Sequence, residues 1–68
     1  MKREEKMNKE LKAAREKSGK TQAQVAEEAK ISESQYQNIE YGKSDPSVRK
    51  AICIARVLNS KVDDLFQE

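Results

Sequence analysis

Apolar residues recur along the chain at the three- and four-residue spacing of amphipathic helices, and no run is rich in β-branched and aromatic residues. The pattern predicts five helices and no strand, which is an all-α fold. The first helix runs roughly from Arg3 to Lys17, with Met7, Leu11 and Ala14 on one face. Gly19 follows it, and a glycine there favours the left-handed conformation that ends many helices.

Two short helices come next, and each begins with a capping-box sequence. These are "TQAQ" from Thr21 and "SESQ" from Ser32. Ile31 and Tyr36 stand at the two positions of a hydrophobic staple, so we expect Ile31 to point inward. Gly42 ends the second helix. Each helix is too short to be stable alone, and the three-residue connection "KIS" predicts a helix-turn-helix at about residues 21–41.

A fourth helix follows "DPS", and the pattern leaves its start open. Either Asp45 is the N-cap and Pro46 is the first helical residue, or Ser47 is the N-cap. Asn59 is expected to end this helix in a left-handed conformation. Its main core stripe is predicted to be Val48, Ile52, Ala55 and Leu58, with Ile54 and Val57 widening it. A last short helix contains Val62, Leu65 and Phe66.

The helix that starts at Ser32 has an unusual outer face. Helical spacing places Ser34, Gln37, Asn38 and Tyr41 in one row, with Glu33 and Gln35 beside it. Tyr36, Ile39 and Glu40 lie on the opposite, inner side. Amide and hydroxyl side chains in a row suit the reading of base edges in the major groove. The alternative is a merely solvated helix, in which Glu33 interacts favourably with the helix N-terminus.

Composition narrows the class of protein. A chain of 68 residues predicts one domain spanning residues 1–68, and its single cysteine, Cys53, allows no intrachain disulfide, which favours the cytoplasm. No apolar run approaches the length of a membrane span. Residues 1–20 hold eight Lys and Arg against four Glu, so this part could contact an anionic partner or could be a solvated face.

The sequence lacks the residues that a catalytic site or a metal site would need. The chain has no histidine, and Cys53 has no base partner, so we predict neither an enzyme nor a metal or cofactor site. We expect no effector domain within these 68 residues and therefore no small-molecule ligand. Leu65 and Phe66 are expected to be exposed. We therefore predict a homodimer interface at Val62, Leu65 and Phe66.

The stretch "TQAQVAEEAKISESQYQNIEYGK…PSVRKAICIARVLNSKVDDLF" resembles the Cro and phage-repressor family of helix-turn-helix proteins, also called the XRE family. The resemblance covers residues 9–66 and implies a five-helix, lambda-repressor-like fold that binds DNA as a dimer. It also implies site residues. The base-reading positions are Glu33, Ser34, Gln35, Gln37 and Asn38. The phosphate-contacting positions are Gln22, Tyr41, Lys43 and Ser44. Arg15 and Glu40 match a structural salt bridge.

The chain departs from the family pattern at four places that concern stability. Asn59 and Ser60 replace a usual glycine and apolar residue, which is expected to weaken the corner between the last two helices. Lys30 stands where the turn usually has glycine, so a left-handed lysine or a shifted turn is expected. Lys20 replaces a buried leucine, and its methylene stem is expected to cover the core. Ser60 is expected to cap the last helix, since Lys61 falls at the usual capping position.

Two functions from different classes follow from these observations. The first is a sequence-specific transcriptional regulator, expected to be a repressor, that binds a near-palindromic operator. The alternative is an antitoxin-like or other protein-interaction module, in which DNA binding is secondary. An antitoxin usually carries an extension that wraps its toxin, and this chain ends at Glu68, soon after the last predicted helix.

Overall fold

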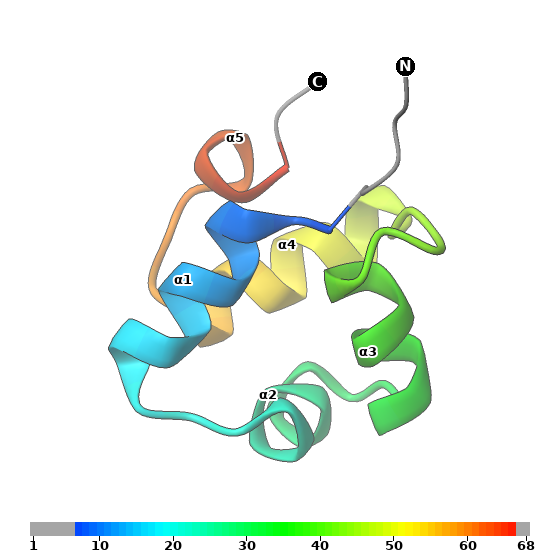
Figure 1. Cartoon of the computed structure of the whole chain (residues 1–68), viewed down its shortest axis with the longest axis horizontal. Coiled ribbons are helices and arrows are strands. Elements are labelled where there is room, and N and C mark those ends of the chain that lie inside the picture. The colour runs from blue at the N-terminus through cyan, green and yellow to red at the C-terminus, as the bar shows by residue number, and fades with distance from the viewer. Residues whose placement is uncertain (1–6, 67–68) are drawn as a thin grey trace.

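Five α-helices make up the fold in the computed structural model, which describes residues 7–66 (Figure 1). They are α1 (Lys9–Ser18), α2 (Gln22–Ala29), α3 (Glu33–Glu40), α4 (Val48–Val57) and α5 (Val62–Leu65). No strand occurs among the described residues, so the predicted all-α class with five helices is confirmed. None of the helices within residues 7–66 has the length and apolar character needed to span a bilayer.

The first helix starts later than predicted. Asn8 has an extended backbone, and its side chain accepts a hydrogen bond from the backbone N–H of Leu11, so Asn8 is the N-cap and α1 begins at Lys9. The predicted start at Arg3 lies outside the described residues, and its extension through residues 7 and 8 is wrong. Asn8 also donates to the backbone carbonyl of Leu65 at 2.7 Å, which ties α1 to α5. That long-range bond leaves no sign in the helical periodicity.

Both capping boxes form as predicted. Thr21 caps α2 and Ser32 caps α3, and in each case the glutamine three residues later returns the bond to the cap residue. The turn between the two helices does not shift. Lys30 instead adopts the left-handed conformation, at φ 63° and ψ 41°, which strains a residue that has a Cβ atom. Ile31 packs against the core from this turn, as expected.

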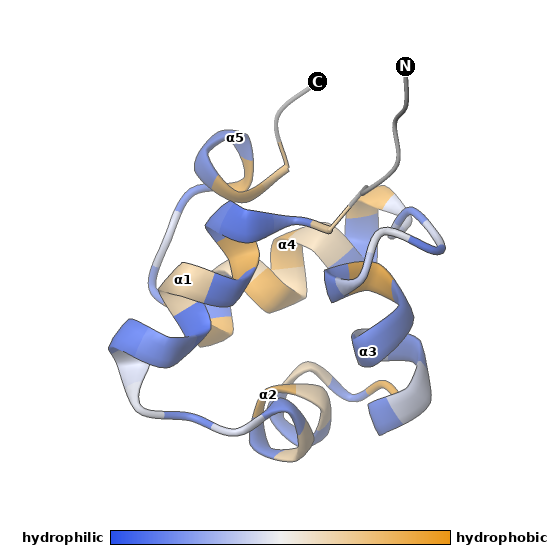
Figure 2. Cartoon of the chain, in the orientation of Figure 1, coloured by the Kyte–Doolittle hydropathy of each residue, from blue (hydrophilic) through white to orange (hydrophobic). Residues whose placement is uncertain are grey.

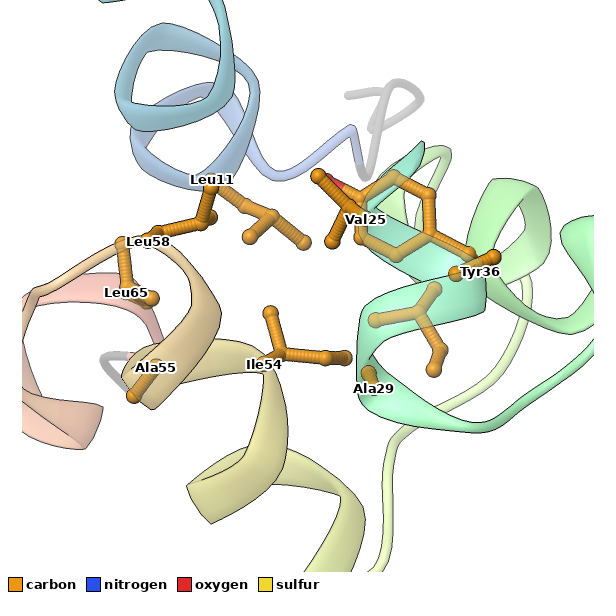
Figure 3. Packing of buried hydrophobic residues seen from close by; sticks show 10 residues of the cluster. Leu11, Val25, Ala29, Tyr36, Ile54, Ala55, Leu58 and Leu65 are labelled. Carbon is orange, nitrogen blue, oxygen red and sulfur yellow. The ribbon is translucent and has the colours of Figure 1, made fainter. Parts of the chain in front are cut away.

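The core lies where α1, α2, α3 and α4 meet, and α5 closes one side (Figure 3). Figure 3 shows Ile54 projecting from α4 into the space that Val25 of α2 and Leu11 of α1 also fill. Figure 2 shows the same arrangement as apolar colour on the inner sides of the helices. The buried cluster consists of Leu11, Val25, Ala26, Ala29, Tyr36, Ile39, Ile54, Ala55, Leu58 and Leu65.

The fourth helix faces the core with a side that overlaps only in part with the one predicted. Ser47 is its N-cap, which resolves the alternative left open by the sequence. Val48 is 77% exposed and Ile52 is 40% exposed, whereas Ile54 is fully buried. The buried face of α4 contains Ala51, Ile54, Ala55 and Leu58. The predicted stripe is confirmed at Ala55 and Leu58 and wrong at Val48 and Ile52. The small Ala51 is buried instead, and a pattern read from large side chains gives such a residue too little weight.

The C-terminal segment also corrects two expectations. Asn59 is left-handed at φ 54°, as predicted, but Ser60 donates to the carbonyl of Leu58 and caps nothing. Lys61 occupies the N-cap position of α5 without a side-chain hydrogen bond. Leu65 is only 3% exposed because it packs into the core, so its predicted role as an exposed dimer contact is wrong. Phe66, also predicted to be exposed, is half-buried.

Candidate nucleic-acid interface

The outer face of α3 is polar, as its sequence predicted. Tyr36, Ile39 and Glu40 are buried beneath it. The outer positions on the other side of the helix are Glu33, Ser34, Gln35 and Asn38, which are exposed, and Gln37, which is half-buried. The structure thus places all five sequence-predicted base-reading residues on one side of a helix that is held in the fold by its opposite side.

Beneath this face lies a single buried carboxylate, that of Glu40. Its oxygens accept hydrogen bonds from Arg15 Nε at 2.9 Å, from the Tyr36 hydroxyl at 2.9 Å and from Gln22 Nε2 at 2.6 Å. Arg15 Nη2 adds a longer contact at 3.5 Å. The Arg15–Glu40 salt bridge that the family resemblance implied is present, and Glu40 is 1% exposed. The group therefore joins α1, α2 and α3 at one point.

These partners keep the carboxylate ionised. Burial alone would raise the pKa of Glu40, but the hydrogen bonds from Arg15, Gln22 and Tyr36 outweigh it and hold that pKa below its ordinary value. Burial, together with the hydrogen bond to Glu40, raises the pKa of Tyr36 well above its ordinary value. Glu40 is therefore a pure acceptor at neutral pH, and Tyr36 remains a donor.

Gln22 connects the buried carboxylate to the surface, a link that the sequence did not predict. Its Nε2 donates to Glu40 and, at 3.5 Å, to the Tyr41 hydroxyl. Its Oε1 accepts from Gln37 Nε2 at 3.2 Å. The side chain was expected to contact phosphate, but its donors are engaged inside the protein. Only the steep crossing of α2 and α3 brings these residues together, and no local pattern in the sequence signals that contact.

Two of the outer side chains are held by neighbours in α3 or at its N-cap. Gln37 Nε2 also donates to Glu33 Oε2 at 3.3 Å, one helical turn earlier. Gln35 Oε1 accepts from the backbone N–H of Ser32 at 3.2 Å, as part of the capping box. Gln35 is therefore turned toward the start of the helix, and Gln37 lies between Glu33 and Gln22.

The segment after α3 brings the remaining predicted residues beside the polar face. Tyr41 is the C-cap of α3, and Gly42 reverses the chain at φ 80°. The backbone N–H groups of Lys43 and Ser44 both donate to the carbonyl of Asn38, at 2.8 Å and 3.3 Å. Lys43 and Ser44 are exposed and fixed against the end of α3. This edge offers a cation and a hydroxyl.

The described part of the chain also contains possible metal-ligating side chains and a single cysteine. Residues 7–66 contain no cluster of three or more His, Cys, Asp or Glu side chains that could hold a metal ion. Cys53 is a free, half-buried cysteine on α4.

Comparison with known proteins identifies the family of the chain. A helix-turn-helix family model matches residues 11–65. An uncharacterized HTH-type transcriptional regulator from Archaeoglobus fulgidus is 40% identical over 52 residues, which are 76% of this chain and 74% of the relative. The N-terminal DNA-binding domain of SinR from Bacillus subtilis matches with a TM-score of 0.81 at 26% identity, covering 90% of each chain. The P22 c2 repressor bound to a synthetic operator matches with a TM-score of 0.84 at 20% identity, over 90% of this chain and 92% of that one.

Proposed function

The chain belongs to the helix-turn-helix family of DNA-binding transcriptional regulators, as its resemblance to the Cro and phage-repressor proteins predicted; from this premise we propose that it binds a near-palindromic operator as a dimer, with α3 in the major groove. Members of this family are regulators of transcription and not enzymes, also as predicted. The observation that carries the proposal is the polar outer face of α3, presented by a helix whose other side is buried.

Base reading is assigned to this outer face. Ser34 and Asn38 are exposed and can donate and accept at base edges, while Glu33 can only accept. Gln35 contributes its amide N–H₂, since its carbonyl belongs to the capping box. Gln37 completes the set. None of these side chains is a cation, so they add sequence preference and little salt dependence.

Phosphate contact is assigned to the edges of the face. Lys43, Ser44 and Tyr41 follow α3 and supply one cation and two hydroxyls. At the start of α2, the backbone N–H groups point out of the helix end, where the dipole favours an anion. Gln22 therefore contacts phosphate through its backbone N–H, and its side chain holds Gln37 instead.

The dimer is proposed to form through a groove beside α5, which lies on the opposite side of the molecule from α2 (Figure 1). The apolar residues of this groove that are exposed or half-buried are Met7, Pro46, Val48, Val62 and Phe66. Lys43 and Ser44, which are assigned to phosphate contact, also line the groove. Val48 is the most exposed of its large hydrophobic side chains, at 77%. A chain this small gains stability by burying such residues against a second copy, and a two-fold dimer matches a palindromic operator.

Val48→Glu tests this interface without removing core packing. Sedimentation equilibrium should give a dimer for the parent and a folded monomer for Val48→Glu. Ile52→Glu is the matched control, because Ile52 is an exposed apolar residue on the same helix but outside the groove. A parent that sediments as a monomer at micromolar concentration, or an Ile52→Glu variant that dissociates equally, contradicts the assigned interface.

Selection of bound sequences from a random DNA pool tests the function as a whole. It should return a near-palindrome with half-sites about 10 base pairs apart.

Lys43→Ala should weaken binding to specific and scrambled duplexes alike and reduce the salt slope by about one unit. Lys61→Ala, the same charge change at the start of α5, should leave the slope unchanged. Asn38→Ala should weaken the selected site by about 1–3 kcal/mol and leave scrambled DNA unaffected. Equal losses on both duplexes would exclude α3 as the reading helix.

A further inference from the structure

The orientation of the Gln22 amide is fixed by its neighbour. An amide side chain can usually turn over and exchange its oxygen and nitrogen at little cost, which leaves its polarity undefined. Gln22 faces the ionised, buried Glu40 at 2.6 Å, and a carboxylate can only accept. The amide must therefore turn its N–H₂ inward. Its oxygen is left on the side of Gln37.

The same logic fixes Gln37. Because Gln22 presents an oxygen, Gln37 must present its N–H₂ to it, at 3.2 Å. The second hydrogen of that N–H₂ is directed to Glu33 Oε2, at 3.3 Å, which is also an acceptor. An amide nitrogen carries two hydrogens, so both are used within the protein. The group that remains for DNA is Gln37 Oε1, an acceptor. The carboxylate of Glu33 beside it is another acceptor.

We propose that Gln37 is a specificity-determining residue that reads its base only as an acceptor, and that Gln22 is the positioning residue that sets this polarity. The inference rests on the proposed function, with α3 in the major groove. A free glutamine binds adenine through two hydrogen bonds, to N6 and N7. An acceptor alone binds the amino group of adenine at N6 or of cytosine at N4. Gln37 therefore selects adenine or cytosine over guanine or thymine.

The experiment measures base preference rather than affinity. Once a selected operator is known, every base pair of one half-site is replaced by the other three, and competition gives relative affinities. Gln37→Met identifies the position that Gln37 reads, because the preference there is lost. At that position the parent should favour adenine and cytosine over guanine and thymine by about tenfold, which is the effect of one hydrogen bond, and should distinguish adenine from cytosine by less than about threefold.

Gln22→Met tests the positioning role. It keeps the length of the side chain but releases one hydrogen of Gln37 and allows the amide to turn over. The preference for adenine and cytosine at the same position should fall to within about threefold, or change to adenine alone. Gln24→Met is the matched control. Gln24 lies in the same turn of α2 and its side chain closes the capping box, so its loss lowers stability and affinity without changing the base preference.

Three results would overturn the inference. The first is a parent that prefers adenine strongly over cytosine, which indicates a two-bond contact with both groups of the Gln37 amide. The second is an unchanged preference in Gln22→Met. The third is a Gln37→Met variant that loses preference at no position. In each of these cases the protein still selects an operator, so the proposed function stands. A protein that selects no sequence overturns both.

Discussion

Removal of the buried carboxylate by Glu40→Ala is the perturbation with the largest expected effect on folding. Glu40 is 1% exposed and accepts from three different helices. The substitution removes the acceptor of the Arg15 guanidinium and of the Tyr36 hydroxyl together. Both donors remain inside the fold, and a buried donor without an acceptor loses its hydration without compensation.

The expected loss in the free energy of unfolding depends on whether each donor can find another hydrogen-bond acceptor. Breaking a buried ion pair by removing one partner costs about 3–5 kcal/mol. Arg15 is 13% exposed and keeps a hydrogen bond to the carbonyl of Lys20, which places its share at the lower end. Tyr36 is fully buried, and an unsatisfied hydroxyl adds about 1 kcal/mol or more. We expect a total of about 3–5 kcal/mol. A chain of 68 residues has a total stability of only about 3–10 kcal/mol, so the variant should be close to unfolding at room temperature.

Urea denaturation followed by circular dichroism measures this loss. Tyr36→Phe should cost about 1 kcal/mol, because only the hydroxyl is removed. Arg15→Ala combined with Glu40→Ala should cost clearly less than the sum of the two single losses, with a coupling of about 1.5–3 kcal/mol. Glu28→Ala is the control, since the Lys20–Glu28 pair is as short, at 2.9 Å, but its side chains are 28% and 47% exposed. It should cost less than about 1 kcal/mol. Equal losses for Glu40→Ala and Glu28→Ala would refute the reasoning.

Three further outcomes are expected, each checked by thermal melts. The lowered pKa of Glu40 stabilises the fold above the unfolded value of about 4.3, and this stability is lost as the pH falls through the folded value; the melting temperature should therefore drop less steeply below about pH 5 in Glu40→Ala than in the parent. Lys30→Gly should stabilise by about 0.5–1 kcal/mol, because glycine relieves the left-handed strain and loses part of that gain to its unfolded entropy; a lower melting temperature would contradict this. Lys61→Ser should stabilise by about 0.5–1 kcal/mol by supplying the missing cap of α5, and Lys61→Ala should not.

Local signals predicted the part of the fold that local chemistry determines. The capping boxes at Thr21 and Ser32 depend only on side chains within three residues, and both form as the sequence indicates. The positions of Tyr36 and Glu40 follow from the same helical spacing. The polar face of α3 could therefore be predicted from one short segment of sequence.

Features that depend on contacts between distant segments could not be predicted in this way. On α4, Ala51 is buried while Val48 and Ile52 are exposed, and the small side chain of an alanine carries little signal in a hydrophobic pattern. The start of α1 depends on Asn8, which is tied to Leu65 at the other end of the chain. The position of Gln22 over Glu40 depends on how α2 crosses α3. Each of these is determined by tertiary packing, which overrides a local pattern.

The buried carboxylate connects stability with recognition. Two apolar side chains of similar volume could replace a buried Arg–Glu pair with little loss of stability, so folding alone does not require a charge at this place. An apolar group, however, has no acceptor for Gln22, and the Gln22 amide would then be free to turn. Its oxygen would no longer fix the amide of Gln37 on the outer face of α3. The ionised Glu40 thus fixes the orientation of the Gln22 amide, and through it the orientation of the Gln37 amide on the surface proposed to meet DNA.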